Sequence, residues 1–429
     1  MVELPRDFLS RAERELGDEF TAFLKSYEVP PVRGIRVNTL KLSKEEFEKI
    51  TPIKLDGEVP WAKDCYYTNE ENLGRHVLHA AGAYYVQEPS AACAAPELEV
   101  KAGERVLDLC SAPGGKGTQL AQDMHGAGVL VLNEIIPKRA EILRSNVERM
   151  GIANALITSC DAQKLSTVFD SYFDKILVDA PCSGEGMFKK EKAAIPEWSL
   201  ESVALCARRQ ESILSNAAKM LAAGGRLVYS TCTFSREEDE LQVSNFITAH
   251  PEFTLIKSKK LMPHKVRGEG HFCAVLEKRG GERRDLPVIV PQVHDKKLLN
   301  SFTEWSAKTL KTEISGLSMR NKSLYSVSCG TPDLSKYKIP LTYGVYLGGL
   351  SADGKRFEPS HSFAMTLSKE RANCVEIDEN TAKQYLRGLT FNCDAPDGWR
   401  VVTYYGLPLG WCKVVKGVAK NHLPKGLRI

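Results

Sequence analysis

The sequence predicts an α/β protein built on a parallel, doubly wound sheet, with a small α+β domain before it and a β-rich module after it. Residues 104–230 carry the central prediction, because short apolar segments alternate there with amphipathic helical segments. A glycine-rich turn, Pro113-Gly114-Gly115, follows the first apolar segment, as in many ligand-binding α/β folds. The C-terminal residues instead show short strand patterns separated by turn residues. A length of 429 residues, at about 150 per domain, agrees with roughly three such units.

The first domain is predicted from residues 1–84. Apolar residues recur at helical spacing between Phe8 and Leu24, which indicates an amphipathic helix. After Pro30-Pro31 the segment Ile35–Leu40 has a strand pattern, and Ser43-x-x-Glu46 forms a capping box for a second helix.

The central sheet is predicted to contain five parallel strands with helices between them, such as Lys138–Met150 and Leu200–Leu221. The strands are Val106–Cys110, Val129–Asn133, Ala155–Ser159, Lys175–Val178 and Arg226–Ser230. Two later extended segments, Phe253–Lys257 and His271–Glu277, are expected to add antiparallel edge strands. Ligands of such sheets bind at the carboxyl ends of the strands.

The C-terminal part begins after a charged, turn-rich boundary at residues 280–285, and residues 286–355 show no clear pattern. Beyond them, short strands are predicted at Cys374–Ile377, Trp399–Tyr405 and Trp411–Val415. The last two are separated by residues 406–410, Gly-Leu-Pro-Leu-Gly, which we interpret as a loop.

Composition excludes several classes of protein. Apolar residues make up 43% and charged residues 26%, values that argue against a disordered, collagen-like or coiled-coil chain. No segment approaches the roughly 18 uncharged apolar residues of a membrane span, and the first residues lack the apolar core of a signal peptide, so we expect a cytoplasmic protein. The closest two of the 12 cysteines, Cys93 and Cys110, lie 17 positions apart, so neither a metal site nor a disulfide framework is predicted.

The charge distribution is more informative than the net charge of +4. Two segments carry cations without acids: Lys257, Lys259, Lys260, Lys265 and Arg267; and Lys413, Lys416, Lys420, Lys425 and Arg428. Clustered cations are typical of proteins that bind a nucleic-acid backbone. A solvated face or a frayed tail is the alternative.

The turn after the first strand, Ser111–Gly117, has the features of a cofactor loop. Its glycines allow close backbone approach, and the following helix offers free N–H groups. A phosphate-binding Walker loop would need Gly at position 110 and Ser or Thr at position 117, and GxGxxG is also absent. Glu134, at the end of the second strand, suits ribose hydroxyls, and Asp161, after the third, suits an adenine amino group. These features predict an S-adenosylmethionine pocket. For each acid taken alone, a helix cap or an ordinary surface residue is the alternative.

Two cysteines follow neighbouring strands of the same sheet. Cys182 lies in Asp179-Ala-Pro-Cys-Ser-Gly-Glu-Gly186, and Cys232 lies in Ser230-Thr-Cys-Thr233. Methylation of a pyrimidine at carbon 5 needs such a group, because a thiolate added to carbon 6 makes carbon 5 nucleophilic. Asp179 and Lys116 are candidates to stabilise the charge that develops on the ring. The target base must be single-stranded or flipped out of a helix.

These motifs resemble the signature set of the RNA 5-methylcytosine methyltransferases, the Nol1/Nop2/Sun family. The matching segments are Leu109–Lys116, Asp179–Gly186, Tyr229–Thr233, Arg36–Lys41, Tyr85–Ser90 and Gly268–Phe272. Toward the C-terminus, Arg356–His361, Leu409–Lys413 and Lys420–Lys425 resemble the bacterial RsmF-type branch, whose chains end in a PUA-like RNA-binding module.

The resemblance implies a Rossmann-like class I S-adenosylmethionine-dependent methyltransferase core with four domains. They are an N-terminal RNA-recognition or packing domain (1–84), the methyltransferase domain (85–280), an intermediate domain (281–355) and a PUA-like domain (356–429). It also implies Cys232 as the nucleophile and Cys182 as the residue that helps release the product, whereas DNA cytosine methyltransferases place the nucleophile in the Pro-Cys motif. Lys116 and Asp179 are implied to lie near the target base.

The resemblance further implies a set of cofactor-binding residues. They are Cys110, Ser111, Ala112, Pro113, Gly114, Gly115, Lys116, Gly117, Glu134, Arg139, Asp161 and Asp179. The family often has Thr where this chain has Gly117, a departure that removes one hydroxyl or capping contact.

The expected activity is S-adenosylmethionine-dependent methylation of carbon 5 of cytosine in RNA. The RsmF-like C-terminal segments favour 16S ribosomal RNA, or the small ribosomal subunit, as the substrate. Two alternatives remain: the same chemistry on transfer RNA, and an RNA-binding assembly factor without catalysis. We expect a monomer that binds neither metal nor membrane.

Overall fold

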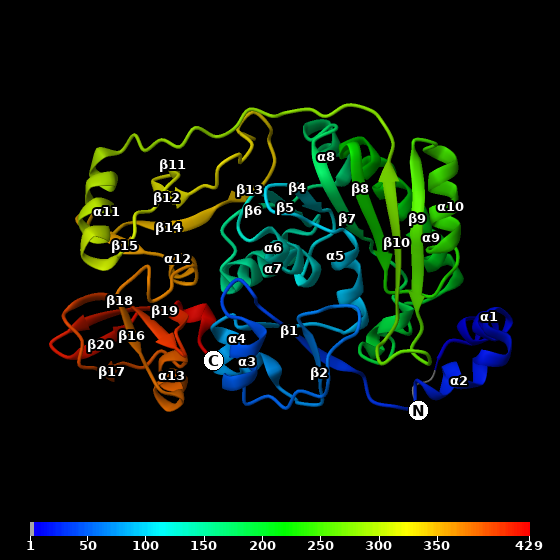
Figure 1. Cartoon of the computed structure of the whole chain (residues 1–429), viewed down its shortest axis with the longest axis horizontal. Helices are drawn as coiled ribbons and strands as arrows, with labels where there is room; N and C mark the ends of the chain where they lie inside the picture. The colour runs from blue at the N-terminus through cyan, green and yellow to red at the C-terminus, as the bar shows by residue number, and fades with distance from the viewer. Residues whose placement is uncertain (1–3) are drawn as a thin grey trace.

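The computed structural model describes residues 4–429. Its centre is an eight-stranded sheet in the order β13-β6-β5-β4-β7-β8-β10-β9 (Figure 1). The strands are β4 (Arg105–Asp108), β5 (Val129–Asn133), β6 (Ala155–Thr158), β7 (Phe173–Asp179), β8 (Leu221–Thr231), β9 (Phe253–Leu261), β10 (His271–Lys278) and β13 (Leu341–Tyr343). β4 to β8 are parallel, while β10 is antiparallel to β8 and β9 is antiparallel to β10. The predicted doubly wound sheet with antiparallel edge strands is confirmed.

Helices cover both faces of this sheet, because neighbouring residues of each buried strand point to opposite sides. Leu107 packs with α8, α9 and α10 on one face, and Val106 packs with α5, α6 and α7 on the other (Figure 1). The helical segments of this domain are η3 (Ser90–Cys93), α5 (Ala94–Glu97), α6 (Gly115–Met124), α7 (Pro137–Met150), α8 (Ala162–Val168), η4 (Glu185–Met187), η5 (Lys192–Ala194), α9 (Leu200–Met220) and α10 (Glu240–Ala249).

The N-terminal domain contains a three-stranded antiparallel sheet in the order β2-β1-β3. Its elements are α1 (Arg6–Leu16), η1 (Gly17–Glu19), α2 (Phe20–Lys25), β1 (Arg33–Val37), α3 (Lys44–Ile50), β2 (Cys65–Thr68), η2 (Leu73–Arg75), α4 (Val77–Ala80) and β3 (Tyr84–Val86). The single predicted helix is divided at Gly17, whose φ of 52° ends α1. The capping box of Ser43 and Glu46 is confirmed.

Two further sheets follow in the C-terminal half, ordered β11-β12-β14-β15 and β16-β18-β19-β20-β17. Their elements are α11 (Lys296–Thr309), β11 (Leu317–Arg320), β12 (Ser323–Ser326), β14 (Val345–Leu350), β15 (Phe357–Pro359), α12 (His361–Ala364), β16 (Cys374–Glu376), α13 (Glu379–Leu386), β17 (Phe391–Asn392), β18 (Gly398–Tyr404), β19 (Leu407–Val415), β20 (Val418–Asn421) and η6 (Lys425–Leu427).

The loop predicted at residues 406–410 is wrong, since β19 already begins at Leu407. Tyr405 and Gly406 have φ angles of 50° and 72°, the positive values of a tight two-residue hairpin turn. Leu407 can therefore pair with Tyr404 at once, and Pro408 lies opposite Thr403 at a β-bulge.

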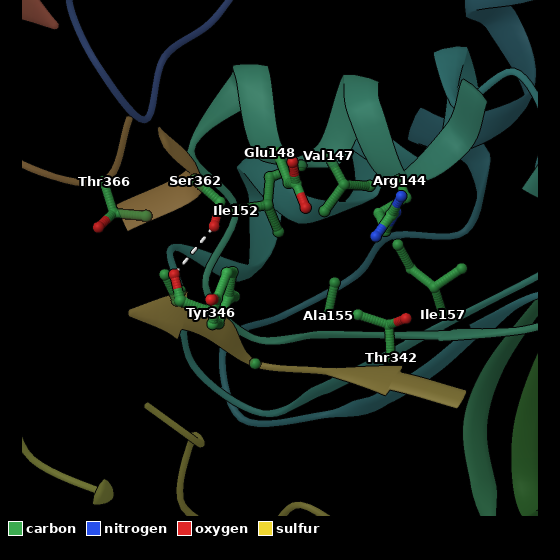
Figure 2. Close-up of a pocket in the computed structure, with 12 residues that line it drawn as sticks. Arg144, Val147, Glu148, Ile152, Ala155, Ile157, Thr342, Tyr346, Ser362 and Thr366 are labelled. Carbon is green, nitrogen blue, oxygen red and sulfur yellow. Dashed lines mark hydrogen bonds between the residues drawn. The ribbon is translucent and has the colours of Figure 1, made fainter. Parts of the chain in front are cut away.

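The first of the C-terminal sheets is joined to the central one by β13, which pairs antiparallel with β6. At this junction Val147 of α7 lies near Thr342 and Tyr346, and the cavity between them has a volume of only about 30 Å³ (Figure 2). Ser362 Oγ donates a 2.9 Å hydrogen bond to the Tyr346 carbonyl there. The junction is therefore closely packed.

The second C-terminal sheet shares a hydrophobic core with the N-terminal domain, although the two are far apart in sequence. Leu78 of α4 and Leu386 of α13 belong to the same buried cluster (Figure 1).

Within residues 4–429, no helix combines the length and the apolar composition that crossing a lipid bilayer requires.

Candidate active site

The predicted cofactor loop lies between β4 and α6, at the carboxyl end of the sheet. Gly114, with φ of 113°, is the N-cap of α6, and the Ser111 N–H donates to the Asn133 carbonyl at 2.8 Å. A Cβ atom at Gly117 would lie 2.6 Å from Ser111 Oγ and 3.0 Å from Asp108 Oδ2. Glycine at position 117 thus permits this close packing behind the loop.

Arg36 of β1 supports this loop from the N-terminal domain. Its buried guanidinium donates to the Gly115 carbonyl at 2.5 Å and to Thr118 Oγ1 at 2.6 Å. Burial lowers the pKa of Arg36 to about 10. Arg36 belongs to the motif Arg36–Lys41 but was not among the predicted site residues. Its contacts favour the packing interpretation of the N-terminal domain.

Glu134 and Arg139 meet beside the loop. The buried Glu134 accepts a hydrogen bond from the Ile136 N–H at 2.9 Å and pairs with Arg139 at 3.1 Å. Arg139 also donates to the Ala112 carbonyl at 2.9 Å. Ile135, which was not among the predicted site residues, is 59% exposed next to Glu134. A buried acid beside an exposed apolar side chain suits the ribose and the base of a nucleoside.

Asp161 follows β6 but is engaged in a local contact. Its carboxylate accepts a 2.7 Å hydrogen bond from the Lys164 N–H and so caps α8. The structure thus shows the helix-capping alternative for Asp161. The residue is exposed, at the edge of the sheet where the cofactor loop also lies.

Lys116 and Asp179 form an ion pair at the centre of the site. Lys116 Nζ lies 2.7 Å from Asp179 Oδ2, and Ser230 Oγ donates to Asp179 Oδ1 at 2.8 Å. Burial opposes ionisation of both groups, but their mutual attraction prevails, so the pKa of Asp179 is lowered and that of Lys116 is raised. Both groups are therefore charged at neutral pH.

His271 also faces Asp179, with Nε2 3.6 Å from Oδ1, and it was not among the predicted site residues. Burial and the nearby Lys116 lower its pKa to about 3, so the ring is neutral at physiological pH. Neither ring nitrogen has a hydrogen-bond partner among residues 4–429. In the sequence, the one signal for His271 as a site residue is its place in the motif Gly268–Phe272.

The two predicted cysteines meet in this site. Cys182 Sγ lies 3.3 Å from Cys232 Sγ. The Cys232 thiol and burial raise the pKa of Cys182 well above its ordinary value, so Cys182 remains a neutral thiol. The loops that carry them are joined directly, because the Gly186 N–H donates to the Cys232 carbonyl at 2.8 Å.

The buried Asp108, behind the loop, is expected to make the stability of the protein depend on pH. Burial raises the pKa of Asp108 to about 7, whereas an aspartate side chain in the unfolded chain has a pKa of roughly 3.9. The contribution of the protonated Asp108 to the free energy of unfolding is therefore fully present below pH 4 and is lost as the pH rises to about 7. We expect Asp108→Asn to be more stable than the native protein by up to about 4 kcal/mol at pH 8 and equally stable at pH 4. Urea unfolding between pH 4 and 8 tests this; parallel pH profiles would contradict it.

The two cation clusters differ in structure. Each cation of the first cluster pairs with an acid from a distant segment: Lys257 and Lys259 with Glu97, Lys260 with Asp239, Lys265 with Glu19 and Arg267 with Asp56. The nucleic-acid interpretation of that cluster loses its support. In the C-terminal cluster, Lys416, Lys420 and Lys425 are exposed and form no ion pair within residues 4–429.

The sheet order, the loop of α6 and the polar groups at the carboxyl ends of β4, β5 and β7 define an S-adenosylmethionine-dependent methyltransferase. Two solved structures are similar to this fold. A methyltransferase homolog from Pyrococcus horikoshii is 27% identical, with a TM-score of 0.58, over 65% of this chain and 96% of that one. NSun6 from the same organism, solved with the S-adenosylmethionine analogue SFG, shares the fold at 23% identity, with a TM-score of 0.59, over 65% of this chain and 99% of that one.

Family models match successive parts of the chain. They describe the N-terminal domain of 16S rRNA methyltransferase RsmF (4–89), 16S rRNA methyltransferase RsmB/F (95–278), the first C-terminal domain of RsmF (301–367) and the RsmF PUA domain (372–429). Ribosomal RNA small subunit methyltransferase F of Shewanella woodyi is 32% identical, across all of this chain and 97% of the relative. The chain belongs to the RsmF family, and it is an enzyme.

Proposed function

We propose that this enzyme transfers the methyl group of S-adenosylmethionine to carbon 5 of a cytosine in 16S ribosomal RNA. The observation that carries the proposal is the pair of cysteine sulfurs, 3.3 Å apart, beside the ion pair of Lys116 and Asp179. The RsmF family models support 16S ribosomal RNA as the substrate. We infer a cytoplasmic monomer, because the small ribosomal subunit is in that compartment and one chain holds the whole site.

Cys232 is the proposed nucleophile. Its thiolate adds to carbon 6 of the ring, and the ring electrons make carbon 5 nucleophilic. When bound, S-adenosylmethionine would supply an electrophilic methyl group to carbon 5, and the bond between that methyl group and the sulfonium would break to leave S-adenosylhomocysteine. Loss of the carbon-5 proton to a base and cleavage of the bond between carbon 6 and sulfur then restore the aromatic ring and the thiolate.

Lys116, Asp179 and Cys182 have distinct roles in this proposal. Lys116 offers a positive charge to the ring while it carries the negative charge of the adduct, and Asp179 orients Lys116. Cys182 keeps its proton, because its pKa is raised, and so can donate a hydrogen bond to the sulfur of Cys232 as that sulfur leaves. The cofactor is held by residues 110–117, Glu134 and Arg139, with Asp161 at the edge.

Incubation with tritiated S-adenosylmethionine tests the proposal. We expect label in 16S ribosomal RNA or small subunits and protection of specific cytosines in bisulfite sequencing. Label in transfer RNA alone would favour the alternative substrate. RNA binding without label would indicate an assembly factor.

The exposed C-terminal lysines are proposed to contact the RNA backbone. We expect Lys420→Ala together with Lys425→Ala to weaken RNA binding and to reduce the salt slope of log K by roughly 1 to 2, because each lost phosphate contact contributes about 0.7–0.9. Filter binding between 50 and 200 mM salt, the range in which such contacts dominate, measures both. Lys257→Ala, in the ion-paired cluster, is the matched control and should change neither the RNA affinity nor its salt slope. An unaltered salt slope in the double variant would assign Lys420 and Lys425 to a solvated face.

A further inference from the structure

Two buried carboxylates lie beside the cysteines and take no part in the chemistry above. Glu185 is three positions after Cys182, and Glu238 is six positions after Cys232. Both side chains are 0% exposed. Because a buried carboxylate is costly unless donors satisfy it, its partners indicate what it holds in place.

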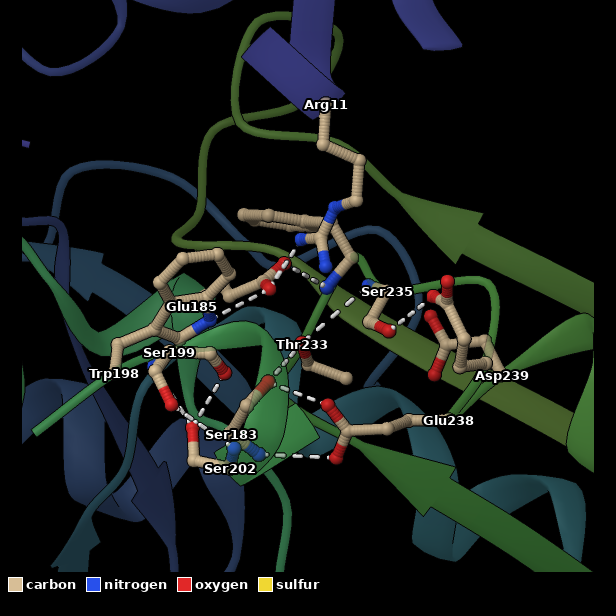
Figure 3. Close-up of polar contacts among 12 residues, drawn as sticks. Arg11, Ser183, Glu185, Trp198, Ser199, Ser202, Thr233, Ser235, Glu238 and Asp239 are labelled. Atoms are coloured by element: carbon tan, nitrogen blue, oxygen red, sulfur yellow. Dashed lines mark hydrogen bonds and ion pairs between the residues drawn. The ribbon is translucent and has the colours of Figure 1, made fainter. Parts of the chain in front are cut away.

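Glu185 belongs to the loop of Cys182 but contacts the loop of Cys232. One of its oxygens accepts a 3.1 Å hydrogen bond from the Phe234 N–H, two residues after Cys232. The other accepts a 2.9 Å hydrogen bond from Trp198 Nε1 and pairs with Arg11 of α1 (Figure 3). Arg11 is itself only 5% exposed and thus supplies the compensating charge inside the protein.

Glu238 has the opposite arrangement. It follows Cys232 in sequence but contacts the loop of Cys182, accepting hydrogen bonds from the Ser183 N–H at 3.0 Å and from the Ser183 hydroxyl (Figure 3). Gln210 Nε2 donates to Glu238 at 2.8 Å and to the Pro181 carbonyl at 3.0 Å, so both neighbours of Cys182 are held. Tyr229 anchors the backbone of Glu238 through its hydroxyl at 2.6 Å.

We propose that Glu185 and Glu238 act as reciprocal positioning residues, each fixing the cysteine of the other loop. Glu185 positions Cys232 for attack, and Glu238 positions Cys182 for release of the product. The inference rests on the proposed function, since it uses the two cysteine roles assigned there.

The physical reason is that the two cysteines are carried by loops rather than by the strands themselves. The strands β7 and β8 end at Asp179 and Thr231, so each sulfur lies one to three residues beyond a rigid element. A displacement of about 1 Å in a reacting group can cost about a hundredfold in rate. Charge-assisted hydrogen bonds, which are about twice as strong as neutral ones, suit this task.

The test separates attack from release by using Glu185→Gln and Glu238→Gln in two backgrounds. An amide has a single acceptor oxygen, so either variant loses part of its contacts without a change in size. In a Cys182→Ala background, where release is blocked, we expect Glu185→Gln to form the covalent protein–RNA adduct about tenfold more slowly, and Glu238→Gln to form it at the parental rate. With native Cys182, Glu238→Gln should accumulate the adduct and Glu185→Gln should not.

A purely structural role would slow adduct formation equally in both variants, and that result would overturn the inference. Adduct on denaturing gels and binding of S-adenosylmethionine are both measured, and cofactor affinity should stay unchanged. Glu240→Gln, an exposed carboxylate paired with Lys260, is the matched control and should behave as its parent. If Glu238→Gln fails to fold, Ser183→Ala removes one donor of the same contact and should accumulate adduct to a smaller extent; no accumulation would contradict the role of Glu238.

Absence of any adduct in Cys182→Ala alone would instead refute the proposed cysteine roles, and the inference with them. The two failures are therefore distinguishable. In the first, the parental adduct forms but the Gln variants do not divide between attack and release. In the second, the parent itself forms no adduct.

Discussion

Replacing Cys232 with alanine should abolish methyl transfer, with a fall in rate of about 10⁴-fold or more, because removal of a covalent nucleophile leaves carbon 5 of the ring unactivated. The measurement is incorporation of tritiated methyl groups into 16S ribosomal RNA. Binding of S-adenosylmethionine should persist, since the cofactor loop is built from β4 and α6 and does not depend on this thiol for its hydrogen bonds.

Cys206→Ala provides a matched control for that loss. Cys206 is a half-buried thiol on α9, outside the two loops that carry Cys182 and Cys232, and its replacement should leave the rate unchanged. Substantial methylation by the Cys232 variant would show that another group attacks the ring.

Replacing Cys182 with alanine should have an equally large effect on turnover but a different product. We expect a covalent protein–RNA adduct that survives denaturing gels, because the hydrogen-bond donor 3.3 Å from Cys232 Sγ is lost when that sulfur has to leave. The raised pKa of Cys182 agrees with the role that the family resemblance implies for it, since a thiol that keeps its proton is a poor nucleophile and a competent donor.

A combined experiment decides between the two cysteines. Incubation of both variants with substrate RNA should show the adduct for Cys182→Ala alone. If Cys232→Ala trapped the RNA instead, the roles would be exchanged, as in the DNA cytosine methyltransferases whose nucleophile lies in a Pro-Cys motif.

The central sheet and the meeting of the candidate site residues at one edge of it were predictable from the amino-acid sequence, because both depend on local patterns. β5 has the expected bounds, and β4, β6 and β7 differ by only a few residues. Parallel strands place their carboxyl ends at one edge, so Lys116, Asp179, Cys182 and Cys232 could be expected to meet there, and they do.

The surroundings of these residues could not be read from local patterns, because their partners are distant in the chain. Arg36 reaches Gly115 across 79 positions, and His271 faces Asp179 from β10. The residues of β13 gave no strand signal, since a three-residue edge strand is stabilised mainly by its pairing with β6.

The charged residues also show which features the sequence predicts and which only the packing decides. The cations of residues 257–267 have no acid nearby in sequence, so they resembled a backbone-binding surface until folding brought Glu97, Asp239, Glu19 and Asp56 against them. Local spacing thus predicted the type of fold and brought out the candidate reacting groups. The three-dimensional packing decided which charges remain free and which carboxylates connect the two cysteine loops, since electrostatic and hydrogen-bond energies depend on distance through space.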